Sequence, residues 1–268
     1  MAADLRRELA AMEGAGWCGP RSMSATNHNQ REIEMTIAED ERTQIRYARL
    51  AGFLYLFLIA VYLLGVTITG RFEVPGNIAE TAHRILENEL LFRFGLALGS
   101  INALGAVLLA VSLYVTLRVV DKNLALLALA FELVYAAAGA ALDLIDYAFL
   151  KQQMDAYSSG ILDVKQLQAI ADMHSFLQSA AMNLVVILYG AGSILFFYLF
   201  LKAKNIPRIL AALGLFGSVL VPLTGFASLI LPHPSKLLQL GWMPMFVAEV
   251  SVGLWLLCKG IILPKQER

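Results

Sequence analysis

Residues 124–149 read LALLALAFELVYAAAGAALDLIDYAF, a run in which only three residues carry a charge. A helix needs about 20 mainly apolar residues to cross about 30 Å of hydrocarbon, and this run is long enough to do so. Other segments of the chain have the same character: 48–69, 94–117, 176–201, 207–231 and 243–262. The sequence therefore predicts an all-α, polytopic membrane protein built as a bundle of six transmembrane helices.

The composition agrees with this class. Hydrophobic residues make up 58% of the chain, charged residues only 16%, and the mean hydropathy is +0.65. A soluble domain has about 25% charged residues. Lys+Arg and Asp+Glu both total 21, so no basic excess favours nucleic acid. The expected partners are the lipid bilayer and a small molecule or ion. The sequence does not identify a protein partner. No cofactor is predicted, and Cys18 and Cys258 lack metal-ligand spacing.

The chain divides into three parts. Residues 1–42 are polar and include a Gly/Pro cluster at 14–20, which indicates a disordered cytoplasmic tail, with a regulatory arm as the alternative. Residues 43–262 form the six-helix transmembrane domain, and residues 263–268 a short cytoplasmic tail. The first apolar run lies too far along the chain, and is too long, for a signal peptide. A translation start at Met35 is a further possibility.

Lys and Arg near the ends of the predicted spans fix the expected orientation, because they concentrate on the cytoplasmic side. One side has twelve: Arg31, Arg42, Arg46, Arg49, Arg118, Lys122, Lys202, Lys204, Arg208, Lys259, Lys265 and Arg268. The other side has six: Arg71, Arg84, Arg93, Lys151, Lys165 and Lys236. We therefore expect a multi-pass protein of the bacterial cytoplasmic membrane with both termini in the cytoplasm.

Two outer connections contain helix-start signals. Asn77 with Glu80 fits an N-terminal capping box, and the apolar face that follows predicts a short helix on the outer membrane surface. Asp163 with Gln166 fits a second box, so we expect a helix that starts there and runs into the fourth span.

The third span carries its charges on one face. At 100° per residue, Glu132, Asp143 and Asp146 share a narrow stripe with Tyr135 and Gly139. A charged group in a span costs about 2.5–3.5 kcal/mol on insertion scales, so the stripe is expected to face the bundle.

Counting along the spans places several polar residues in the outer half of the membrane. The main candidates for a ligand or ion site are Arg93, Asp143, Asp146, His174 and Glu249. Secondary polar candidates are Asn102, Gln178 and Asn183, together with Glu132, which the count places nearer the cytoplasm. Glu132 fits either a neutral carboxyl group or a partner for a cation on another helix, and the sequence does not decide between them.

Three interpretations of this cluster stay open. The leading function class is binding, sensing or passage of a small ligand or ion. In the second, Asp143, Asp146, His174 and Glu249 hold a metal for an intramembrane hydrolase, although no HExxH spacing or similar metal motif occurs. In the third, Arg93 neutralises one of the acids and ties helices together in a structural or accessory subunit. Catalytic residues are not identified.

Several ordered motifs resemble one family. They are Leu91-Phe92-Arg93-Phe94-Gly95 after Val74-Pro75-Gly76, Lys122-Asn123-Leu124-Ala125-Leu126-Leu127-Ala128, Ile206-Pro207-Arg208-Ile209-Leu210, and Leu254-Trp255-Leu256-Leu257-x-Lys259-Gly260 after Glu249. Over roughly residues 43–262 the chain resembles the prokaryotic membrane proteins grouped as domain of unknown function 4386. The resemblance implies a six-helix bacterial inner-membrane protein and supplies no established activity. It also implies a start shortly before the first span, which favours Met35.

Overall fold

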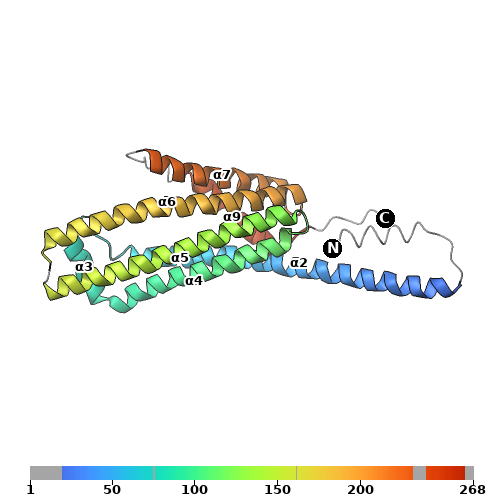
Figure 1. The fold of residues 1–268 in the computed structure, drawn as a ribbon, viewed down its shortest axis with the longest axis horizontal. Coiled ribbons are helices and arrows are strands. Elements are labelled where there is room, and N and C mark those ends of the chain that lie inside the picture. Colours follow the sequence, from blue (N-terminus) through green and yellow to red (C-terminus); the bar gives the residue numbers. More distant parts are fainter. Residues whose placement is uncertain (1–19, 75, 161, 232–239, 263–268) are drawn as a thin grey trace.

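The structure, a computed structural model, describes residues 20–74, 76–160, 162–231 and 240–262. These residues form helices joined by short connections, with no strand among them (Figure 1). The helices are α2 (Pro20–Thr69), α3 (Ile78–Glu87), α4 (Glu89–Leu117), α5 (Lys122–Ser159), α6 (Val164–Ala203), α7 (Arg208–Ile230) and α9 (Met243–Cys258). The predicted all-α membrane bundle is confirmed.

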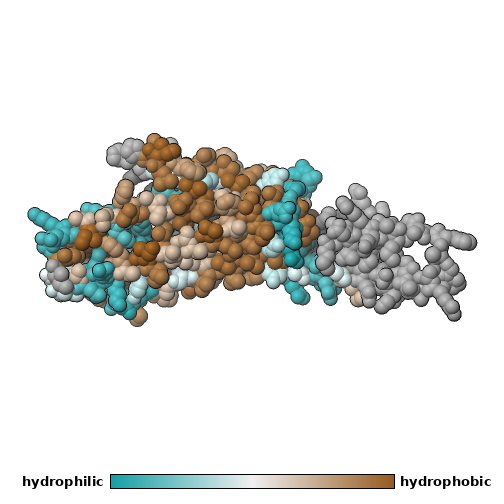
Figure 2. Space-filling view, viewed as in Figure 1, coloured by the Kyte–Doolittle hydropathy of each residue, from teal (hydrophilic) through white to brown (hydrophobic). Residues whose placement is uncertain are grey.

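The long helices are arranged as a closed ring. Going round it, α2 packs on α4, α4 on α5, α5 on α6, α6 on α7, α7 on α9, and α9 returns to α2. On the face drawn in Figure 2, a broad hydrophobic belt lies between two hydrophilic rims, as expected for a chain whose surface meets lipid. Side chains that point inward from different helices therefore meet near the ring axis.

The count of six spans holds only approximately. Five helices are long and apolar enough to cross a membrane: Ala38–Thr69 within α2, and all of α4, α5, α6 and α7. The sixth predicted span, 243–262, corresponds to α9, which has only 16 residues and is about 24 Å long. Gly260, with φ of +71°, follows its end, and the Ile262 N–H then donates to the Asn205 carbonyl oxygen at 2.7 Å. This hydrogen bond ties the end of α9 to the α6–α7 connection.

At one end, the bundle continues beyond the length of a span. α5 and α6 have 38 and 40 residues, about 57 and 60 Å, so each reaches well past a hydrocarbon layer of about 30 Å. A second hydrophobic core supports this end: Val61, Ile68, Phe72, Ile85, Phe92 and Leu98. We call this end the helical head. The helices extend beyond the predicted spans 124–149 and 176–201, and α6 starts at Val164, as the capping box at Asp163 predicted.

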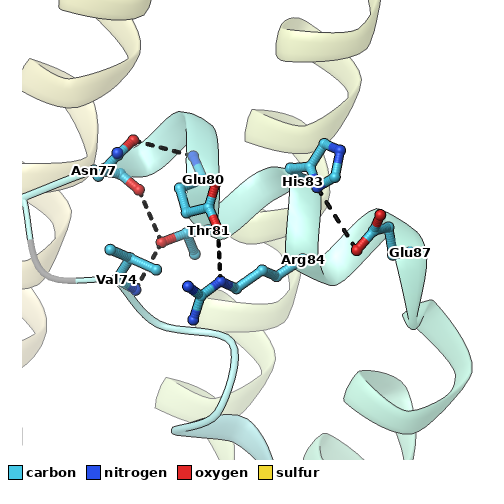
Figure 3. Close-up of polar contacts among 7 residues, drawn as sticks. All are labelled: Val74, Asn77, Glu80, Thr81, His83, Arg84 and Glu87. Carbon is cyan, nitrogen blue, oxygen red and sulfur yellow. Dashed lines mark hydrogen bonds and ion pairs between the residues drawn. The ribbon is translucent and has the colours of Figure 1, made fainter.

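α3 packs against the bundle within the helical head. It contacts α4, α5 and α6, and its Ile85 side chain is only 2% exposed. Leu86, expected on the same apolar face, is exposed. The N-caps at Asn77 and Asp163 are confirmed, although Asn77 forms only half of the predicted box, since the Glu80 side chain accepts from Arg84 instead. The Asn77 side chain accepts from the Glu80 N–H at 3.1 Å (Figure 3), and Asp163 with Gln166 forms a complete capping box.

Side-chain contacts also hold the start of α3 in place. The Thr81 hydroxyl donates to the Asn77 carbonyl oxygen at 3.0 Å and accepts from the Val74 N–H at 3.0 Å (Figure 3). The Ile78 N–H donates to Gln168 Oε1 of α6 at 2.9 Å. These bonds satisfy backbone groups that an isolated helix start leaves unpaired, and they fix α3 against α6.

The opposite end of the bundle is held by Asp121, the N-cap of α5. Its side chain accepts from the Leu124 N–H at 3.2 Å and from Lys202 Nζ of α6 at 3.0 Å. The Leu124 N–H, followed by Lys202, lowers the pKa of the Asp121 carboxyl group from its ordinary value. The start of α5 and the end of α6 are therefore at the same level of the bundle.

The first helix starts earlier than we expected. Residues 20–42, predicted to lie in a disordered tail, continue α2 back to Pro20, and Figure 1 shows this part of α2 running past the rest of the bundle. No Gly or Pro occurs between Arg21 and Ala51, so nothing in the covalent structure stops a helix once the span has formed it. The rest of the predicted tail, residues 1–19, and the segment 263–268 lie outside the described residues.

Candidate functional site

Three polar side chains lie at the same level of the bundle, about 15 Å from the end that contains Asp121. Glu132 is ten residues after Lys122 on α5, Ser193 is ten residues before Ala203 on α6, and Glu249 is nine residues before the end of α9. At 1.5 Å per residue these spacings are about 15, 15 and 14 Å, half of a hydrocarbon layer of about 30 Å. Since these three helix ends are at the same end of the bundle, the three side chains share one level.

Glu132 packs directly against α6. Its side chain is 9% exposed, and the Ser193 hydroxyl donates to its Oε1 at 3.3 Å. A Cβ atom added at Gly192 would lie 2.6 Å from the same oxygen. The absence of a side chain at Gly192 therefore makes room for the carboxyl group between α5 and α6.

Glu249 reaches the same face of α6 from α9. The Tyr189 hydroxyl donates to Oε1 of Glu249 at 2.5 Å. Tyr189 and Ser193 are four residues apart, one helical turn, so the two carboxyl groups approach α6 one turn from each other. Neither carboxyl group is paired with Lys, Arg or His within the described part of the chain.

Aromatic rings surround this pair. The Tyr189 ring lies 5.1 Å from the Tyr135 ring of α5 and stacks on Trp242 at 6.1 Å between centroids. Tyr55 of α2 is 5% exposed, and its Cβ is 3.1 Å from the Cβ position of Gly253, one turn after Glu249. Tyr55 is also within electrostatic reach of both carboxyl groups. We call Glu132, Glu249, Ser193, Tyr189, Tyr135, Tyr55 and Trp242 the central site.

A second polar group lies farther toward the helical head. Nε2 of His174 on α6 lies 3.1 Å from Oδ1 of Asp146 on α5, and the Gln178 side-chain amide donates to Oδ2 of Asp146. The His174 ring stacks on Phe149, with centroids 3.8 Å apart and an interplanar angle of 8°. The side chains of His174 and Asp146 are each about 15% exposed. This group joins α5 to α6 at the base of the head.

Arg93 does not neutralise any of the predicted acids. Its guanidinium donates to Glu89, one turn earlier on α4, and about half of each side chain is exposed. Arg93 and Asp143 line one groove between α4 and α5 without an ion pair between them. Glu89, four residues earlier on the same helix, pairs with Arg93 at little conformational cost. This i, i+4 spacing could have been recognised in the sequence.

The remaining candidates are not part of the central site. The side chains of Asn102 and Asn183 are partly buried and make no hydrogen bond with any described residue. The backbone carbonyl of Asn183 faces Gly225 of α7. Within residues 20–74, 76–160, 162–231 and 240–262, no three His, Cys, Asp or Glu side chains are grouped so that they could hold a metal. The four residues suggested as metal ligands therefore do not form a common site; they are Asp143, Asp146, His174 and Glu249.

The structure thus divides the predicted cluster and adds residues to it. Asp146 and His174 are in contact, with Gln178 beside them, while Glu249 belongs with Glu132 in the central site. The depth count separated the two glutamates because it took the sixth span to be 20 residues long and placed Glu249 near its outer end. Ser193, Tyr189, Tyr55 and Trp242 were not predicted as site residues, whereas Tyr135 was expected on the stripe that faces the bundle. A hydroxyl group inside an apolar run is only a weak signal, since many such groups bond to their own helix.

The exposed ion pair of Arg93 with Glu89 can be tested by mutation. Arg93→Ala is expected to lower the free energy of unfolding by less than about 1 kcal/mol, because an exposed i, i+4 ion pair contributes about 0.3–0.5 kcal/mol. The measurement is reversible unfolding in detergent, compared with Glu89→Ala and the double variant. A loss of about 3–5 kcal/mol, as expected for breaking a buried ion pair, would contradict the observed geometry.

The fold and the central site define a multi-pass, all-α membrane protein with carboxyl groups inside the bundle. The family described as Domain of unknown function (DUF4386) matches residues 50–260, and the chain belongs to this family. Neither the curated proteins nor the solved structures include a match to the chain.

Proposed function

We propose that the protein binds a small cationic ligand at the central site and passes it through the bundle. The observation that carries this proposal is the pair of glutamates, Glu132 and Glu249, which approach one face of α6 from two different helices. Ionisable groups inside a bundle are expensive and are commonly kept for ligand, ion or proton pathways. The proposed site lies at mid-depth, rather than in the outer half as expected from sequence.

The chemistry of the central site favours an organic ammonium group. Ser193 and Tyr189 supply hydroxyl donors to the carboxyl groups, and no basic side chain among the described residues supplies the opposite charge. Carboxylates attract a cation, and the faces of Tyr and Trp rings attract it further through their quadrupoles. Tyr135, Tyr189 and Trp242 provide such rings beside Glu249. An alkylammonium ion matches both features.

A route for passage leads along α5 toward the helical head. Glu132, Tyr135, Gly139 and Asp146 share one face of this helix. A Cβ atom added at Gly139 would meet nothing within 4 Å, so there is open space beside this position. Gln178 and His174 of α6 line the polar end of the same face at Asp146. These features support access to the central site from the helical head.

The binding test uses tetramethylammonium chloride as the probe, with sodium chloride at the same ionic strength as the control. The purified protein is titrated, and both melting temperature and tryptophan fluorescence are measured. We expect a saturable change with tetramethylammonium, because Trp242 stacks on Tyr189 at the proposed site. Trp242→Phe should lose most of the fluorescence change and keep the melting shift. An absence of saturable binding would favour an accessory subunit without a ligand.

Passage is tested separately, by uptake of labelled tetramethylammonium into vesicles containing the protein. Uptake that saturates and requires Glu249 is the expected result. Binding without uptake would leave a receptor or sensor and contradict the transport part of the proposal.

We also propose that the helical head faces away from the cytoplasm of a bacterial cell membrane. The support is the excess of Lys and Arg at the opposite end, twelve against six. A reporter active only in the cytoplasm is therefore expected to work after Arg268 or within residues 119–122, and to fail within 152–162. The measurement is reporter activity in cells, normalised to the amount of fusion protein. Activity within 152–162 would reverse the orientation and make the proposed route open inward.

A further inference from the structure

The structure has a second feature suited to binding, a groove of about 310 Å³ between α4 and α5. Its polar lining residues are Arg93 and Ser100 of α4 with Asp143 and Tyr147 of α5, and its other lining residues are apolar. Arg93 is 24 residues before the end of α4, and Asp143 is 21 residues after the start of α5. These spacings are about 36 and 32 Å, which puts the groove at the far boundary of the hydrocarbon layer.

The groove contains one positive and one negative side chain, Arg93 and Asp143, at the boundary of the hydrocarbon layer. Arg93 uses one amino group to bond Glu89, and the guanidinium has further N–H donors that suit a phosphate group. Asp143 has no hydrogen-bond or ion-pair partner among the described residues. Its Oδ2 lies against α4, since a Cβ atom added at Gly99 would be 2.9 Å away. The carboxylate is therefore held between the two helices, inside the groove.

The surroundings of the groove are those of a lipid site. Leu144, part of the lining, is 68% exposed, and Leu104, one turn below Ser100 on α4, is 70% exposed. Such large exposed apolar side chains below a polar groove can contact acyl chains. A free polar solute would gain nothing from them, so we commit to a lipid as the occupant.

We infer that this groove binds the headgroup of a zwitterionic phospholipid that has a primary ammonium group, of the phosphatidylethanolamine type. Arg93 contacts the phosphate, while Asp143 accepts hydrogen bonds from the ammonium group, with the hydroxyl groups of Ser100 and Tyr147 beside it. A choline headgroup has no N–H donor for Asp143. A glycerol headgroup has no positive charge to pair with the Asp143 carboxylate, so the lipid adds a net negative charge beside Asp143 and Glu89. This inference does not depend on the proposed function.

The test compares the binding of phosphatidylethanolamine, phosphatidylcholine and phosphatidylglycerol with identical acyl chains, measured by native mass spectrometry of the purified protein. We expect phosphatidylethanolamine to bind at least tenfold more tightly than either of the others. Asp143→Asn should remove the preference for ethanolamine over choline and leave the binding of phosphatidylcholine unchanged. Arg93→Ala should weaken the binding of all three lipids, because each of them loses the phosphate contact, and should leave the preference for ethanolamine over choline in place.

Asp155→Asn is the matched control, since Asp155 is an exposed carboxylate three turns farther along α5 and does not line the groove. It should leave the affinities for all three lipids as they are. Equal binding of the three lipids by the unmodified protein would overturn the inference. A loss of preference in Asp155→Asn as large as in Asp143→Asn would do the same, because it would indicate a general effect of negative charge.

Discussion

Replacing Glu249 with Gln is expected to weaken the binding of tetramethylammonium at least 30-fold. Removing one partner from a desolvated charge pair costs about 2–5 kcal/mol, and a 30-fold change corresponds to about 2 kcal/mol. Gln has nearly the same shape as Glu, and its carbonyl oxygen can still accept the Tyr189 hydroxyl hydrogen. The fold should therefore remain, with the free energy of unfolding changed by less than about 1 kcal/mol. Titration calorimetry and thermal unfolding measure the two quantities on one preparation.

The matched control is Glu87→Gln, which removes an exposed carboxylate from α3, outside the central site. It should leave the affinity for tetramethylammonium unchanged. Glu132→Gln should also reduce the affinity, because Glu132 contacts α6 at Ser193, one helical turn from the Tyr189 that bonds Glu249. Equal affinities of the unmodified protein and Glu249→Gln would exclude Glu249 as a ligand-binding group. A large loss of stability with unchanged affinity would assign it a structural role.

Replacing Gly52 with Ala is expected to lower the free energy of unfolding by about 3 kcal/mol. A Cβ atom at Gly52 of α2 would lie 2.4 Å from the backbone nitrogen of Leu257 and 2.8 Å from the carbonyl oxygen of Gly253. Both atoms belong to the backbone of α9, so no side-chain rotation can relieve the contact. Overpacking costs about 1–3 kcal/mol where side chains can adjust, and we place this variant at the upper limit. The measurement is reversible unfolding in mixed micelles.

Gly139→Ala is the control for this prediction, because it makes the same chemical change in another membrane helix. A Cβ atom at Gly139 would meet nothing within 4 Å, so Ala should be neutral or should stabilise the helix by up to about 1 kcal/mol. Similar losses for the two variants would indicate a general effect of helix propensity or flexibility. They would contradict the close backbone contact of α2 with α9.

Local signals in the sequence were enough to predict the helices and some of their ends. The apolar run at 124–149 requires a spanning helix, since a backbone in hydrocarbon must satisfy its own hydrogen bonds. The caps at Asn77 and Asp163 were found because they depend on residues only three positions apart. The resemblance to the family came from short ordered motifs and agrees with the match over residues 50–260.

Contacts between residues that are distant in the sequence could not be predicted from such local signals. Glu132 and Glu249 are far apart in the sequence, and their approach to the same face of α6 depends on α9 closing the ring between α2 and α7. Their depths depend on where α9 ends, which the Ile262–Asn205 hydrogen bond and the left-handed Gly260 define. The interpretation in which Arg93 neutralises a membrane acid was wrong, because Arg93 pairs with Glu89 on its own helix, whereas the predicted acids lie on other helices.

From the sequence alone one can conclude that this protein is an all-α membrane bundle, where its apolar helices lie, and which ionisable residues share one face of α5. These properties follow from hydropathy and from spacings within a single helix, so neighbouring residues carry all the information. Only the tertiary structure decided that Glu132 shares a site with Glu249, that Asp146 pairs with His174, and that Arg93 pairs with Glu89. The physical reason is that helix register and depth are set by packing between helices, such as the backbone contact at Gly52, which no single helix specifies.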